Sequence, residues 1–78
     1  MGEDPRVRVM TVARVREAPG RDTDVMFNES ARIYRLARGL AGYEGMVRLL
    51  HAAQESGARV RVGLSEPHGE VIEHIEAG

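Results

Sequence analysis

Hydrophobic residues recur at steps of three and four from Tyr43 onward, and this spacing predicts a helix. The apolar stripe of this helix contains Met46, Val47, Leu49, Leu50 and Ala53. Gly57 follows the stripe, where a glycine can take the left-handed conformation that ends a helix without steric cost. The pattern then changes to a period of two over residues 58–64, which predicts a half-buried strand.

The region before the helix predicts a hairpin of two strands. Residues 7–16 alternate, but apolar side chains occupy both faces in the middle of the segment. This pattern indicates either a strand covered on both sides at its centre or a bulge near residues 10–12. Residues 18–22 combine proline with glycine, as type II turns do, and residues 24–27 alternate again as the returning strand.

Residues 28–40 fit two interpretations. A period of two places Arg32, Tyr34 and Leu36 on one face of a third strand, whereas a helical period aligns Ile33, Leu36, Ala37 and Leu40. We favour the strand, because isoleucine and tyrosine are common in strands and the segment at 24–27 needs a neighbour.

The chain closes with a second predicted hairpin, in which residues 58–64 pair with residues 70–76 through a turn at 65–69. The apolar residues Val71, Ile72 and Ile75 fall on both faces of the last strand. Because a half-covered sheet buries only one face, we expect the surplus side chains to lie in a contact with another subunit. Val71, Ile72 and Ile75 are therefore the predicted interface.

One hydrophobic core is predicted to join all these elements. Its predicted members are Val9, Val15, Val25, Phe27, Met46, Leu50, Val60, Val62, Ile72 and one of Ile33 and Tyr34.

The order strand, strand, strand, helix, strand, strand is that of the oligonucleotide/oligosaccharide-binding (OB) barrel, a mainly β, α+β fold of five strands. If residues 28–40 are not a strand, the order becomes that of a β-grasp fold. The predicted organisation is a flexible arm at residues 1–5 and a single OB-like domain at residues 6–78.

A resemblance supports this order over residues 23–76. The spacing Tyr43…Leu49-Leu50…Ala52-Ala53…Ser56-Gly57…Val60…Val62…Gly69-Glu70…Ile72…Ile75 resembles the second half of small bacterial OB-like domains. Relatives of the B subunits of AB5-type toxins are among these domains. The resemblance implies a helix before two closing strands and assembly of the domains into rings.

The composition is that of an ordinary globular domain. The 78 residues are 42% hydrophobic and 29% charged, and they include no cysteine, so disulfides and thiolate metal sites are excluded. A domain of this size buries a small core, so association with a second chain is an expected source of stability. No apolar segment of export or membrane-spanning length occurs, and we expect a cytoplasmic protein.

Charge is distributed unevenly, and every basic residue is an arginine. Residues 6–38 hold eight arginines against four acids, a net charge of +4, whereas residues 39–78 hold three against six, a net charge of −3. Such polarity favours either contact between unlike faces of two copies or attraction of an anion by the first half.

The arginines are the best candidates for binding, since arginine binds phosphate bidentately. The predicted binding residues are Arg8, Arg14, Arg16, Arg32, Tyr34 and Arg35, with Tyr34 as a surface for base stacking.

His51, His68 and His74 are not spaced to converge on a metal ion, and no nucleophile stands in a catalytic motif. We therefore expect that the protein is not an enzyme and binds no metal or cofactor. The predicted function is a binding or assembly module that forms a homo-oligomer, and the alternative is OB-type binding of single-stranded nucleic acid or another anionic polymer.

Overall fold

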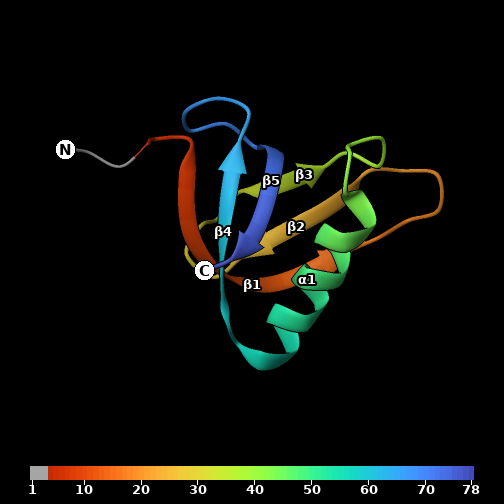
Figure 1. Cartoon of the computed structure of the whole chain (residues 1–78), viewed down its shortest axis with the longest axis horizontal. Coiled ribbons are helices and arrows are strands. Elements are labelled where there is room, and N and C mark those ends of the chain that lie inside the picture. Colours follow the sequence, from red (N-terminus) through yellow and green to blue (C-terminus); the bar gives the residue numbers. More distant parts are fainter. Residues whose placement is uncertain (1–3) are drawn as a thin grey trace.

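The computed structural model describes residues 4–78 and shows a closed barrel of five strands with one helix (Figure 1). The elements are β1 (Val7–Arg16), β2 (Thr23–Phe27), β3 (Ile33–Leu36), α1 (Tyr43–Ser56), β4 (Arg59–Leu64) and β5 (Val71–Ala77). Around the barrel the strand order is β1-β2-β3-β5-β4, with β3 and β5 parallel and the other neighbouring pairs antiparallel. The OB-like prediction is confirmed, and the β-grasp alternative is wrong because β3 is a strand of the barrel.

The predicted arm at residues 1–5 falls partly outside the described residues, which begin at Asp4. Asp4 itself is tied to the start of the barrel. Its backbone carbonyl accepts a hydrogen bond from the N–H of Val7 at 2.9 Å, and its carboxylate accepts one from the N–H of Arg6 at 2.9 Å.

Strand β1 changes partners and faces along its length. Residues 7–11 pair with β4 and residues 12–16 pair with β2, and the register shifts between Val12 and Arg14. This shift is a β-bulge that makes Ala13 an extra residue, so that Val12 and Val15 both turn toward the barrel interior. Met10 and Val12 are buried core residues, whereas Val9 is 43% exposed. The prediction of Val9 as core was wrong, because strict alternation through the bulge selects the opposite face.

Strand β3 supplies Tyr34 to the core in place of Ile33. Tyr34 is 1% exposed and packs edge-on against Phe27, with 5.3 Å between the ring centroids. Ile33 is 55% exposed on the outer surface. The prediction of Tyr34 as an exposed stacking surface was therefore wrong, since the ring fills the barrel.

A second bulge explains the apolar residues on both faces of β5. Gly63 pairs with His74 and Leu64 with Ile72, so Glu73 is an extra residue in β5. Ile72 and Ile75, three positions apart, consequently both point into the core, while Val71 is 46% exposed. Their burial removes Ile72 and Ile75 from the predicted interface and leaves Val71 on the surface.

Helix α1 covers the end of the barrel where β1 finishes. It ends as predicted at Gly57, which has φ 74° and donates its N–H to the carbonyl of Ala53 at 2.8 Å. His51 is 2.6 Å from the carboxylate of Glu17, just after β1, and Gln54 donates to the carbonyl of Ala13 at 3.2 Å. At the opposite end, where β1 begins and the β4–β5 loop lies, no helix formed by residues 4–78 covers the barrel (Figure 1).

Candidate functional site

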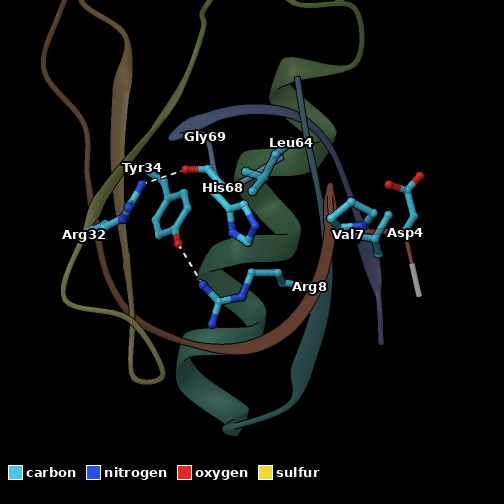
Figure 2. Close-up of a pocket in the computed structure, with 9 residues that line it drawn as sticks. Asp4, Val7, Arg8, Arg32, Tyr34, Leu64, His68 and Gly69 are labelled. Atoms are coloured by element: carbon cyan, nitrogen blue, oxygen red, sulfur yellow. Dashed lines mark hydrogen bonds between the residues drawn. The ribbon is translucent and has the colours of Figure 1, made fainter. Parts of the chain in front are cut away.

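A pocket of about 650 Å³ opens at the end of the barrel opposite α1 (Figure 2). Three separate segments form its walls. They are residues 4–8 at the start of β1, residues 32–34 at the start of β3, and residues 64–69 in the loop between β4 and β5. Two arginines, Arg8 and Arg32, face this space together with Tyr34 and His68.

The arginines reach the pocket because each extends a row of inward-facing residues beyond the core. Arg8 pairs with the buried Val62 and precedes Met10 and Val12 in alternation, and Arg32 precedes Tyr34 in the same way. At the end of the barrel these rows reach solvent, so a charged side chain can occupy an inward position. The same alternation that buries the apolar residues therefore brings Arg8 and Arg32 together.

Tyr34 forms the floor of the pocket and holds Arg8 in place. The Nη1 of Arg8 donates to the Tyr34 hydroxyl at 3.2 Å, and this hydroxyl donates to the Oγ of Ser30 at 3.1 Å. The buried phenol is thus fully hydrogen-bonded, as a tyrosine in a core requires.

Arg32, the second arginine of the pocket, is held by the β4–β5 loop. Its Nη1 donates to the backbone carbonyl of His68 at 2.7 Å, and its backbone N–H donates to the Oγ of Ser30 at 3.2 Å. The Oε2 of Glu70 lies as far as 4.0 Å from the Nη1 of Arg32, and both side chains are more than half exposed. Such a surface ion pair contributes little, so Arg32 keeps most of its capacity to bind an anion.

His68 has an unusual backbone conformation where it meets Arg32. Its φ is 59°, a left-handed value that costs a non-glycine residue about 1–2 kcal/mol. Gly69 completes the turn by donating its N–H to the carbonyl of Glu66 at 3.0 Å. A Cβ on Gly69 would lie 2.9 Å from the Cγ and 3.1 Å from the carbonyl oxygen of Glu66, so any other residue would force this turn to shift. This turn directs the His68 carbonyl at Arg32.

The loop that carries Ser30 is fastened to β1 by Glu29. The Glu29 carboxylate accepts hydrogen bonds from the Thr11 hydroxyl at 2.7 Å and from the Thr11 backbone N–H at 2.8 Å. These bonds, the one from the hydroxyl first, lower the pKa of Glu29 below its ordinary value. Ser30, and through it Tyr34 and Arg32, is thereby fixed relative to β1.

The charges around the pocket leave it basic. Asp4 lies at the rim, but Arg6 neutralises it through contacts of 3.2 and 3.3 Å, and the side-chain hydrogen bond from Arg6 lowers the pKa of Asp4. Within residues 4–78, Arg8 forms no salt bridge. As far as residues 4–78 are concerned, the pocket thus presents one guanidinium without a carboxylate partner and a second that is only loosely paired.

The structure divides the predicted arginine surface in two. Arg8, Arg32 and Tyr34 meet in the pocket, whereas Arg14, Arg16 and Arg35 lie exposed on the outer face of β1, β2 and β3. Arg16 and Arg35 flank Asp24 across three adjacent strands. The bulge at Ala13 causes the division, because it places Arg14 and Arg16 on the face opposite Arg8.

Two residues of the site were missed from the sequence. Ser30 carried no signal beyond its place in a turn, and its role depends on contacts with residues brought near by the fold. His68 stood in a recognisable turn, but nothing in the sequence indicated that its carbonyl would meet an arginine 36 positions earlier.

The fold and the pocket define a small OB-like barrel with a basic pocket at one end. No group of three histidine, cysteine, aspartate or glutamate side chains in residues 4–78 is placed to hold a metal ion. Over the same residues, no helix combines the length and apolar character needed to cross a membrane. Comparison of the chain with protein-family models, curated proteins and solved structures finds no match in any of the three. The resemblance to relatives of toxin B subunits stays a prediction.

Proposed function

We propose that this protein is a non-enzymatic OB-like module that binds single-stranded nucleic acid through its phosphates in the cytoplasm. The observation that carries the proposal is the convergence of Arg8 and Arg32 in one pocket of about 650 Å³. This volume lies within the usual range of ligand sites. Charge-assisted hydrogen bonds from guanidinium groups are the strongest that proteins offer to phosphate oxygens.

The position of the pocket also supports a nucleic-acid ligand. OB barrels bind oligonucleotides with the face of their second and third strands and with the loops between strands one and two and between strands four and five. Here the β4–β5 loop contributes His68 and Gly69 to the pocket. Arg14, Arg16 and Arg35 form a second, separate group of positive charges on the outer face of β1 and β3, where the backbone of a longer strand can make further phosphate contacts.

Burial of the aromatic residues determines what kind of binding is expected. Phe27 and Tyr34 are buried and Tyr43 is half-buried, so none of the three rings offers a fully exposed face for stacking of bases. Binding then depends on phosphate contacts, which are insensitive to sequence and weaken steeply with salt.

Fluorescence anisotropy with a labelled oligothymidylate of about 12 nucleotides tests the proposal. We expect Arg8→Gln and Arg32→Gln each to weaken binding about tenfold, since a hydrogen bond to a charged group contributes about 1.5–3 kcal/mol. Each variant should also reduce the slope of log K against log salt by about 0.7. Arg48→Gln is the matched control, because Arg48 is exposed on α1 and lies outside the pocket. Wild-type affinity in both pocket variants, or no salt-sensitive binding by the wild type, would contradict the proposal.

A second proposal, self-association, is favoured by an exposed apolar pair on the outer surface. Ile33 and Val71 are 55% and 46% exposed and line one hollow with Asp24, Arg35 and Glu70. Within residues 4–78, neither Asp24 nor Arg35 forms a salt bridge. A surface with apolar residues and both signs of charge can pair with a second copy of itself, since a two-fold axis can bring Arg35 of one copy to an acid of the other.

Light scattering on the Val71→Lys variant tests this interface. The lysine should dissociate the oligomer and leave the circular-dichroism spectrum unchanged, because Val71 lies outside the core. Val9→Lys is the matched control, since Val9 is 43% exposed on β1 and does not line the hollow. A wild-type protein that is an 8.6 kDa monomer at both low and high salt would exclude self-association.

A further inference from the structure

We infer that the pocket selects a terminal phosphomonoester, at the end of a nucleic-acid strand, over an internal phosphodiester. This inference rests on the proposed function and adds the part of the nucleic acid that the pocket holds. A terminal phosphate carries a charge of about −1.5 to −2 at pH 7, with three acceptor oxygens. An internal phosphate carries a single negative charge.

The charge of the pocket matches the terminal group. Arg8 and Arg32 contribute two positive charges, and among residues 4–78 the acids Asp4 and Glu70 offset them weakly. Asp4 is engaged by Arg6 in a contact of 3.2 Å, and Glu70 is 4.0 Å from Arg32 between exposed side chains. A dianion therefore gains attraction to two guanidinium groups, whereas a monoanion leaves one positive charge unmatched.

The two arginines are also oriented before any ligand binds. Each guanidinium has five N–H donors, and one of them holds the side chain in place. This donor bonds to the Tyr34 hydroxyl in Arg8 and to the His68 carbonyl in Arg32. The remaining donors stay available for a group with several acceptor oxygens. Since the side chains are already held, less conformational entropy is lost when the phosphate binds.

The shape of the pocket favours a group that enters from one side. Its lining comes from three segments, at residues 4–8, 32–34 and 64–69, with the buried Tyr34 as the floor (Figure 2). The imidazole of His68 extends into the same space as the Arg8 guanidinium (Figure 2). An internal phosphate continues into a nucleotide on both sides, whereas a terminal phosphate has one connection and three free oxygens.

The test compares three oligothymidylates of about 12 nucleotides, each labelled on an internal base. One carries a 5′-phosphate, one carries a 3′-phosphate and one has neither. We expect the wild-type protein to bind at least one phosphorylated strand about tenfold more tightly than the unphosphorylated strand, given the extra unit charge near two guanidinium groups. Arg8→Gln and Arg32→Gln should each abolish this preference. Arg14→Gln, on the outer face, should weaken binding of all three strands by the same factor, and Arg48→Gln should change none.

Equal affinity for the three strands would overturn the inference and leave the proposed function standing. Absence of binding to all three would overturn both. Displacement of the phosphorylated strand by inorganic phosphate, at concentrations similar to those of the unlabelled strand, would identify a small free anion as the ligand and also overturn the inference. The comparison of strands on the wild-type protein needs no variant, so a folding defect in Arg8→Gln does not affect it.

Discussion

Replacing Tyr34 by phenylalanine separates the structural role of this side chain from its role in orienting Arg8. The substitution keeps the ring, which is 1% exposed and packs on Phe27, and removes only the hydroxyl. Two hydrogen bonds are lost, one from Arg8 at 3.2 Å and one to Ser30 at 3.1 Å.

The expected stability change is small because both partners can reach water. An ordinary hydrogen bond contributes about 0.5–1.5 kcal/mol, and the larger penalty applies only where a buried partner is left without a bond. Arg8 is exposed and Ser30 is half-buried, so we expect a total loss of about 1 kcal/mol. For a domain of this size, that loss corresponds to a fall in Tm of about 4–8 °C. Tyr34→Ala, which also removes the ring, should cost about 3–5 kcal/mol.

The binding change has a different cause. Without the hydroxyl, Arg8 is free to rotate, and ordering it again on binding costs about 0.5–1.5 kcal/mol. The affinity for oligothymidylate should therefore fall between about twofold and about tenfold. Thermal denaturation followed by circular dichroism measures the first effect, and fluorescence anisotropy measures the second. If Tyr34→Phe lowers the Tm as expected but binds like the wild type, Arg8 does not depend on Tyr34 for its position and the reasoning on preorganisation is wrong.

Two further predictions concern the stability of the barrel. Leu50 is fully buried at the centre of the α1 stripe, so Leu50→Ala should lower the free energy of unfolding by about 2–5 kcal/mol, and a loss below about 1 kcal/mol in urea denaturation would mean that the helix packs differently. Thr11 lowers the pKa of Glu29 in the folded state, so the stabilisation is complete above the ordinary value of 4.5 and is lost as the pH falls through the lower folded value. The stability difference between the wild type and Glu29→Gln should shrink over that acid range, and a difference that stays constant down to pH 3 would contradict the role of the carboxylate.

Local patterns were sufficient to predict α1 and both hairpins, whereas residues 28–40 fitted a strand and a helix alike. The stripe from Met46 to Ala53 with a glycine at 57 specifies α1 because its period and its C-terminal signal agree. Turn chemistry at Pro19 and Gly20 likewise specifies the first hairpin, in which Arg21 donates its N–H to the carbonyl of Ala18 at 3.1 Å.

Which side chains of each strand face the core was less predictable, because strict alternation assumes that the strand contains no β-bulge. The errors at Val9 and at Ile72 and Ile75 come from bulges, at Ala13 and at Glu73. A signal was present in each case, namely two apolar residues three positions apart in a strand. Ile72 and Ile75 show this spacing, and both are buried.

The pocket could not be predicted from the sequence, because its contacts join residues that are far apart along the chain. Arg8 and Tyr34 are 26 positions apart, and Arg32 and His68 are 36 apart. That arginines would supply the positive charge of any basic surface was predictable, because every basic residue of the chain is an arginine. Which arginines meet depends on the bulge at Ala13, which separates Arg8 from Arg14.

Deleting Glu73 tests whether the bulge in β5 serves mainly to bring Ile72 and Ile75 to one face. Without Glu73, these two residues are two positions apart, so ordinary alternation keeps both in the core, where they are now 1% and 4% exposed. The deletion should therefore cost little, about 1 kcal/mol or less, since no apolar side chain leaves the interior.

Deleting Arg61 from β4 is the matched control, because Arg61 lies between Val60 and Val62, which are both fully buried. There the alternation breaks, one of the valines must turn outward, and exposing it costs at least about 1.5–3 kcal/mol. Urea denaturation of both variants measures the difference. If the two deletions destabilise the protein equally, the bulge is needed for the twist that closes the barrel, and the argument from side-chain direction is wrong.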